Sequence, residues 1–187
     1  MRYHIQRIGI ALMLAVALAG VSLAQTSRET ATVKVAVVEF TPGPSASGMT
    51  PEAKRQMQAS MAFALRKSNK FDIVDVRWTR MASEGDLAAI NGGSSTAAAV
   101  KLGRQLGVTH VLTGTVEEYT PQGGDGFGHV LLKTRLVEVA TGKVKHAGET
   151  AQRSTSAMRT TNAAEMHTKA MRPALEKLAA TLAGLRA

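Results

Sequence analysis

Four histidines beyond the N-terminal region are the residues best suited to bind a metal or to transfer protons: His110, His129, His146 and His167. Imidazole binds zinc readily, and its proton exchange falls near neutral pH. A zinc pair needs i, i+4 spacing on a helix or a similarly short spacing on a strand. No two of the four have such a spacing, and His110 lies inside an apolar strand where we expect it to be packed. We therefore predict no metal site and no catalytic histidine.

Two predicted strands that flank a Thr-Gly turn carry His129 and His146, so their pairing decides whether these side chains meet. If residues 140–143 form the loop, His146 falls opposite Val137 and His129 falls opposite Ser154. The two histidines then lie apart, and a shared metal site would lack its ligands.

A glycine-rich segment at residues 123–128, with the sequence GGDGFG, resembles a phosphate-binding loop only in composition. A dinucleotide loop needs a following helix whose first N–H groups face the phosphate. A strand follows here, so those donors are missing and we predict no cofactor site. The segment is expected to form a flexible hairpin tip, in which Phe127 is a candidate for contact with a partner.

Other nucleophiles and acids show no catalytic arrangement. The chain has no cysteine, and its serines do not occur in a G-x-S-x-G motif. Asp72 and Asp75 flank a predicted strand, and Glu117 and Glu118 end another. Residues an odd number apart on a strand point to opposite faces, which separates the members of each pair. The chain is therefore predicted not to be an enzyme, and a small hydrolase of unrecognised type is kept as an alternative.

The first half of the chain alternates predicted strands and helices. The apolar run at residues 33–40 is typical of a central strand covered on both faces. Residues 41–48 contain two prolines and two glycines and are expected to break regular structure. Thr50 is a suitable helix cap before Pro51, and the apolar positions that follow have helical spacing. A half-covered strand is predicted at residues 71–76, followed by a short helix and a longer one.

The second half begins with the most distinctive stretch, residues 107–145. It predicts a strand, a glycine-rich hairpin, a second strand, a Thr-Gly turn in which Gly142 takes a positive φ, and a third strand. The final segment, residues 155–187, has helical composition, and Pro173 is expected to kink or divide it. Residues 33–187 are thus predicted to form a single-domain α/β sandwich with a mixed sheet of about five strands, a C-terminal antiparallel meander and three or four helices.

Three motifs, in this order, resemble the CsgG-like family of bacterial envelope proteins. They are VAVVEF at residues 35–40, LGVTHVLTGTV at residues 106–116 and RLVEVATGKV at residues 135–144. The family includes the curli secretion channel, activators of penicillin-binding proteins and flagellar outer-membrane accessory proteins. The resemblance covers residues 33–150. It implies a non-catalytic envelope protein that binds a protein partner and assists cell-envelope assembly or secretion.

Residues 1–24 are predicted to be a signal peptide, cleaved after Ala24 or after Ala19, because a basic start precedes an apolar run and small residues. Residues 25–32 are polar and are expected to be a flexible mature terminus. Export would place the protein in the periplasm, outside the cell or peripheral to the outer membrane, with no transmembrane segment after cleavage. Many members of the resembled family are lipoproteins, but this chain has no cysteine to carry the lipid.

Positive charge is concentrated near the C-terminus. The chain carries 23 Lys and Arg against 14 acids, and residues 129–187 hold ten of the former and four of the latter. This surplus favours an anionic envelope polymer or an envelope protein as the partner, whereas export and the scarcity of aromatic residues argue against nucleic acid. The preferred contact surface comprises Lys143, Lys145, Arg153 and Arg159, with Phe127 as the second choice.

The other alternative is an oligomeric outer-membrane secretion pore of the curli type. A membrane-spanning β-hairpin needs two strands of about 9–11 residues with alternating apolar positions. The loop at residues 120–128 contains a proline and four glycines and is too short to supply them. The segment after Val144 is polar and basic. A compact binding domain is therefore the leading interpretation, and a homo-oligomer is left open.

Overall fold

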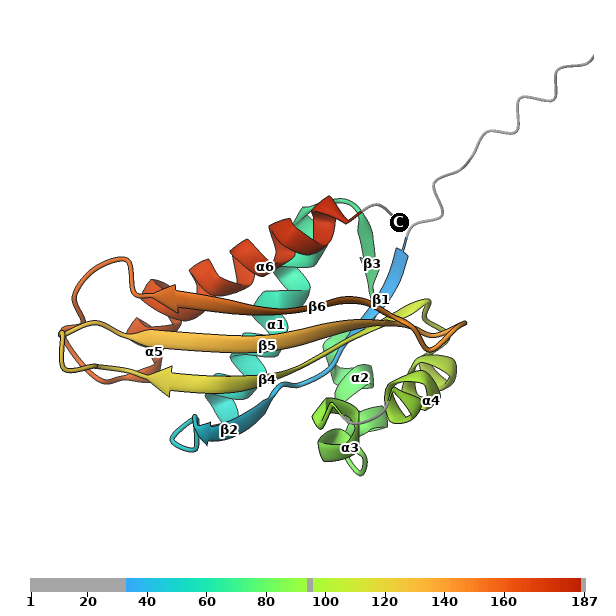
Figure 1. The fold of residues 1–187 in the computed structure, drawn as a ribbon, viewed down its shortest axis with the longest axis horizontal. Coiled ribbons are helices and arrows are strands. Elements are labelled where there is room, and N and C mark those ends of the chain that lie inside the picture. The colour runs from blue at the N-terminus through green and yellow to red at the C-terminus, as the bar shows by residue number, and fades with distance from the viewer. Residues whose placement is uncertain (1–32, 94–95, 186–187) are drawn as a thin grey trace, which may run out of the picture. The chain divides into compact units, whose positions relative to one another are not determined.

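A computed structural model describes residues 33–93 and 96–185. The predicted signal peptide at residues 1–24 and the predicted flexible terminus at residues 25–32 lie outside the described residues. The described chain forms a mixed β-sheet with helices packed on both faces, which confirms the predicted α/β class (Figure 1).

Six strands form the sheet within the described residues. They are β1 (Val33–Val37), β2 (Thr41–Ser45), β3 (Phe71–Ile73), β4 (His110–Thr120), β5 (His129–Glu138) and β6 (Val144–Arg153). The main order is β3-β1-β4-β5-β6, and β2 pairs with the part of β4 beyond β1. Strand β1 pairs in parallel with β3 and with β4, and β2 pairs in parallel with β4. Strands β4, β5 and β6 form the predicted antiparallel meander.

Strand β2 lies in the segment that was predicted to lack regular structure, so that prediction was wrong. Pro42 and Pro44 cannot donate ladder hydrogen bonds, but a strand at the sheet edge needs donors on one side only. Pro42 lies beside Val116 of β4, and the register shifts further along β2. The strand shows no apolar alternation that could have revealed it.

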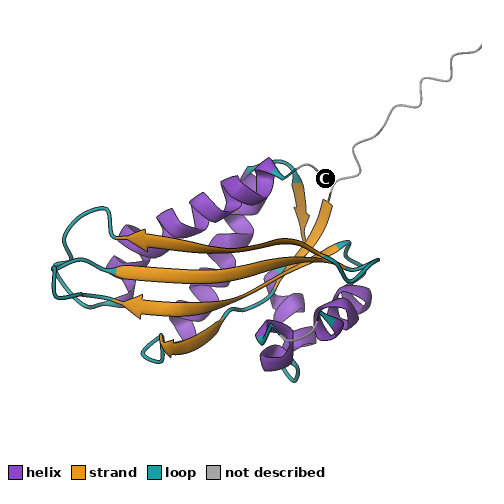
Figure 2. Cartoon of the chain, viewed as in Figure 1, coloured by secondary structure: helices purple, strands orange, loops and turns teal. Residues whose placement is uncertain are grey.

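Helices cover the two faces of the sheet unequally (Figure 2). One face carries α1, α5, the π-helical turn η1 and α6, and the other carries α3 and α4 with α2 beside them. Their bounds are α1 (Pro51–Lys67), α2 (Val76–Ser83), α3 (Leu87–Asn91), α4 (Ala97–Leu106), α5 (Ala163–Met166), η1 (His167–Met171) and α6 (Arg172–Gly184).

Local signals set most of the helix ends. The Thr50 hydroxyl accepts a hydrogen bond of 3.2 Å from the backbone N–H of Ala53, which confirms the predicted cap of α1. The strand predicted at residues 71–76 stops early because the Asp75 carboxylate accepts a bond of 2.7 Å from the backbone of Arg77 and begins α2. Pro173 lies in the first turn of α6, directly after the π-helical turn. The predicted division does not occur as a break, because residues 163–184 stay helical throughout and change only from α to π and back.

The turn between β5 and β6 has the predicted Thr-Gly composition, and Gly142 has a φ of 68°. The predicted register was wrong by one residue: His146 lies opposite Leu136, and His129 lies opposite Arg153. The loop between β5 and β6 is wider than expected, and β6 carries a bulge near its start. The wider loop shifts the pairing of the two strands in one direction, and the bulge shifts it part of the way back. The two histidines still do not face each other, as expected.

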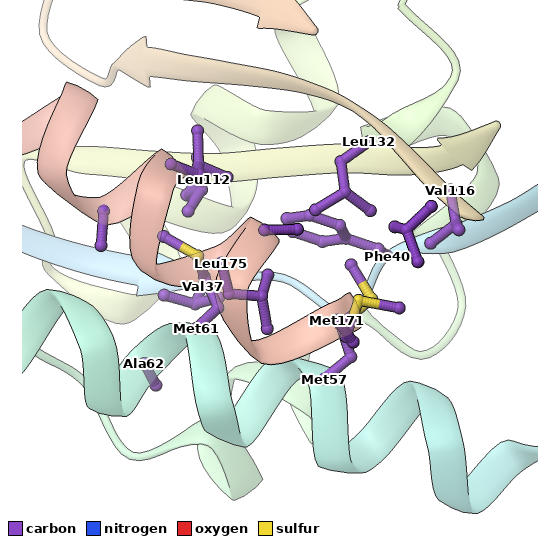
Figure 3. Packing of buried hydrophobic residues seen from close by; sticks show 14 of the residues in the cluster. Val37, Phe40, Met57, Met61, Ala62, Leu112, Val116, Leu132, Met171 and Leu175 are labelled. Atoms are coloured by element: carbon purple, nitrogen blue, oxygen red, sulfur yellow. The ribbon is translucent and has the colours of Figure 1, made fainter. Parts of the chain in front are cut away.

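The main core lies between the sheet and the helices α1 and α6 (Figure 3). Met57 and Met61, on the predicted apolar stripe of α1, lie in one cluster with strand residues and with Met171 of η1 and Leu175 of α6. The labelled members of this cluster include Val37, Phe40, Met57, Met61, Leu112, Leu132, Met171 and Leu175. A smaller core on the other face joins α3 and α4 to the ends of β1, β4 and β5. Burial of these two clusters fixes β4 and β5 between the helix layers.

Gly114, in the middle of β4, is needed because the chain is crowded there. A Cβ atom at this position would lie 2.7 Å from the backbone oxygen of Lys133 and 3.1 Å from Cε2 of Phe40. Its backbone N–H donates a bond of 3.0 Å to the buried amide oxygen of Asn91, whose Nδ2 donates to the Glu39 carbonyl at 2.8 Å. The glycine in the LTGTV motif is therefore a packing residue.

Candidate partner-binding site

Asp125 organises the loop between β4 and β5. Its Oδ1 accepts a hydrogen bond of 3.0 Å from the backbone N–H of Phe127 and lies 3.1 Å from Nε2 of His129. Its Oδ2 accepts a bond of 3.1 Å from Nε of Arg153, at the end of β6. The bond from Phe127, followed by that from His129, holds the pKa of Asp125 well below its usual range. The loop that was predicted to be a flexible tip is thus tied to a neighbouring strand.

Arg153 also stacks on the aromatic ring of the same loop. Its guanidinium carbon lies 3.1 Å from the centre of the Phe127 ring, a cation–π contact. We call Asp125, Phe127, His129 and Arg153 the Arg153 cluster. Arg153, one of the predicted basic contact residues, and Phe127, the second choice, therefore meet at one place. The guanidinium remains half exposed, so the cluster can meet another molecule without unfolding.

The loop that follows β6 lies beside this cluster. The backbone N–H of Met158 donates a bond of 2.9 Å to the carbonyl of Gly126, which places Arg159 next to the hairpin loop. The Glu165 carboxylate accepts a bond of 3.0 Å from the Arg159 backbone and a salt bridge of 2.7 Å from Lys169. These contacts, Lys169 foremost, lower the pKa of Glu165 to about 2. Arg159 is therefore held near the Arg153 cluster by its backbone, and its side chain is exposed.

Lys143 and Lys145 lie at the opposite end of β6. Arg153 is eight positions after Lys145 in this extended strand, which places their Cα atoms about 26 Å apart. The Lys145 ammonium lies 3.5 Å from Oε1 of Glu138, and this pair sits beside the Thr-Gly turn. The four basic residues that the sequence grouped into one contact surface thus occupy two separate places.

A shallow depression of about 270 Å³ borders the Arg153 cluster. Strands β4, β5 and β6 supply its walls, which contain both polar and apolar residues. Besides His129 and Arg153 its lining includes Glu118, Leu131 and Ala151. The cluster and this depression together offer a preformed surface with an aromatic ring, a guanidinium and a small apolar floor.

One pairing of catalytic residue types escaped the sequence reading because its members are 107 residues apart: the Ser60 hydroxyl lies 3.1 Å from Nε2 of His167. Burial, followed by the nearby charge of Arg172, lowers the pKa of this histidine. The hydroxyl sits in the middle of α1, where backbone N–H groups are already bonded within the helix, so it lacks donors for an oxyanion. Across residues 33–93 and 96–185, no group of three or more His, Asp or Glu side chains is placed to hold a metal ion.

The described chain is thus an α/β sandwich with a fixed guanidinium–aromatic surface at one end of its sheet. The family model described as the peptidoglycan-synthase activator LpoB matches residues 53–152, more than half of the chain. The chain belongs to this family. The match runs from the start of α1 to the end of β6, and it includes every member of the Arg153 cluster except Arg153 itself, which is the next residue.

Solved structures share the fold. The hypothetical protein CT253 from Chlamydia trachomatis has a TM-score of 0.59 at 13% identity, over 82% of this chain and 97% of its own. The lipoprotein GNA1162 from Neisseria meningitidis has a TM-score of 0.53 at 20% identity, over 80% of this chain and 99% of its own. The PelC dodecamer from Paraburkholderia phytofirmans has a TM-score of 0.50 at 21% identity, over 82% and 89%. No curated protein matches the chain.

The family match confirms the predicted class of envelope protein at its broader level. Activators of penicillin-binding proteins were one branch of the resemblance drawn from the motifs, and that is the branch the match supports. The CsgG-like name and a curli-type role are not confirmed. Of the helices in the described part of the chain, none is long and apolar enough to cross a membrane.

Proposed function

We propose that this protein is exported to the cell envelope, where it binds a peptidoglycan synthase and raises its activity without performing chemistry itself. The observation that carries the proposal is the match of residues 53–152 to the peptidoglycan-synthase activator family. The Ser60–His167 pair lacks the surroundings of a nucleophilic site, which argues against the hydrolase alternative.

The Arg153 cluster and the adjacent Arg159 form the proposed contact with the synthase. Arginine and aromatic side chains carry much of the binding energy at protein interfaces when they are held in place and surrounded by less critical contacts. Asp125 holds Arg153 and the Phe127 backbone, so little side-chain freedom is lost when a partner binds. Lys143 and Lys145 are assigned to a separate surface because the length of β6 divides them from this contact.

Activation by binding requires that the protein hold the active state of the synthase more tightly than the inactive state. A tenfold rise in activity that arises from such a population shift needs a difference in binding free energy of about 1.4 kcal/mol. Truncation of one critical residue at a protein interface costs about 2 kcal/mol or more, so a single such contact between Arg153 and the synthase would be of this size. The proposed site is therefore large enough in energy for the proposed effect.

Crosslinking in the intact envelope tests the partner. Phe127 is replaced by a photoreactive phenylalanine analogue, and Val144, which is 40% exposed at the other end of β6, receives the same analogue as a matched control. Illumination followed by mass spectrometry should identify a peptidoglycan synthase attached at position 127 and little or none at position 144. Attachment of unrelated proteins alone at position 127 would refute the proposed partner.

A further inference from the structure

Residues of α1 and α6, two helices that lie side by side over one face of the sheet, line an open groove of about 750 Å³. Small side chains form much of its lining, together with the larger side chain of Leu175. Members of the lining include Ala59, Ala64, Ala179 and Ala180. Phe63 also lines the groove, and its side chain is 66% exposed. Covering a phenylalanine ring is worth about 1.5–3 kcal/mol, so this exposed ring is a site of attraction for an apolar surface.

Charges of both signs surround the groove. Lys67, Arg172 and Glu176 line it, and within the described residues none of the three makes a salt bridge. Arg172 and Glu176 are four residues apart on α6 and therefore lie on the same side of that helix. A partner of a single charge sign would leave either Arg172 or Glu176 unpaired. A second copy of this surface, with the direction of α6 reversed, offers an opposite charge to each of these two side chains.

We propose that the groove is a self-docking surface at which two copies of this chain pack α1 and α6 against each other about a two-fold axis. A two-fold interface must be complementary to itself, and this surface has a protruding ring, a hollow lined by small residues and both charge signs. The axis reverses the direction of α6 in the second copy. Arg172 of each copy then lies against Glu176 of the other, which creates two equivalent ion pairs beside the buried Phe63 rings.

The size of the surface predicts a weak dimer. Helix α1 has 17 residues and is therefore about 25 Å long, and two helices side by side are roughly 20 Å wide. Such a face buries about 450 Å² on each copy, or about 900 Å² in total, which is below the range of stable complexes and typical of transient ones. The dimer should therefore appear at micromolar concentrations or above. The groove shares no residue with the Arg153 cluster, so either proposal can fail without the other.

Sedimentation velocity of the protein, at concentrations between about 5 and 500 μM, tests this proposal. The mass should rise towards twice the monomer mass, and Phe63→Glu should weaken the association at least tenfold. Trp78→Glu on α2 is the matched control, because Trp78 is 63% exposed but lies outside the groove. This control should associate like the unmodified protein, and circular dichroism should show that each variant is folded.

Charge reversal tests the pairing itself. Arg172→Glu and Glu176→Arg should each weaken association, since each places like charges together, and the double variant R172E/E176R should recover it. A protein that stays monomeric over the whole concentration range would overturn the proposal. So would a dimer that Phe63→Glu leaves unchanged, or single reversals that the double variant fails to rescue.

Discussion

Arg153 and Phe127 meet face to face, with the guanidinium carbon 3.1 Å from the centre of the aromatic ring. The contact joins the end of β6, a strand at the edge of the sheet, to the hairpin loop between β4 and β5. Asp125 bonds to both partners, to the side chain of Arg153 and to the backbone of Phe127. A surface fixed in this way loses little conformational entropy on binding, which makes it a suitable contact for a protein partner.

Replacement of Arg153 by alanine should weaken binding of the peptidoglycan synthase about tenfold to thirtyfold, because it removes both the cation–π contact and the bond to Asp125. Arg153→Lys keeps the charge but loses the planar stacking group, so an intermediate loss is expected. Affinity measured by calorimetry at constant salt gives both values. Lys143→Ala is the control and should change affinity less than twofold. An equal loss for Lys143→Ala and Arg153→Ala would show that the contact lies elsewhere.

Acid should destabilise the loop after β6 through Glu165. The folded state lowers the pKa of this carboxyl from 4.5 to about 2, with the salt bridge to Lys169 as the largest cause. A lowered pKa stabilises the fold above the unfolded value, and this stability is lost as the pH falls through the folded value. Glu165→Gln should therefore have a lower Tm than the unmodified protein at pH 6, and the difference should vanish between pH 4.5 and about 2. A constant difference at pH 6 and pH 2 would contradict this assignment.

Gly114→Ala should destabilise the protein by about 1–3 kcal/mol, measured by urea unfolding, because the new methyl group would press on the Lys133 carbonyl. Gly124→Ala is the matched control. Gly124 lies in the hairpin loop, has open space around its Cα and lacks a positive φ, so alanine there should change the free energy of unfolding by less than about 0.5 kcal/mol. Equal stability of the two variants would show that β4 and β5 can separate to make room.

Much of the fold follows from local signals in the sequence. The Thr50 cap and the positive φ of Gly142 each depend on neighbouring residues, and each was predicted. Strand β2 was missed because its stability comes from pairing with β4, and no pattern of its own marks it. The register of β5 and β6 was also missed, since a bulge and a wider loop leave no trace in the apolar alternation.

The candidate site was only partly predictable for a similar reason. Phe127 and Arg153 were both selected from the sequence, but their contact depends on strand pairing and could not be seen from either residue alone. Lys143 and Arg153 were grouped because they are near in sequence, yet an extended strand carries such residues far apart. Asp125 was not selected as a site residue, because a single aspartate in a glycine-rich loop is a common turn residue and carries no further signal.

The Arg153 cluster is the surface through which we propose that this protein raises the activity of a peptidoglycan synthase. The most direct measurement is the rate of glycan polymerisation by a purified synthase from the same cell, with the unmodified protein or with Arg153→Ala added at the same concentration. We expect a rate increase of several fold with the unmodified protein and with Lys143→Ala, and little increase with Arg153→Ala. An unchanged rate with the unmodified protein would contradict the proposed function, and full activation by Arg153→Ala would contradict the proposed site.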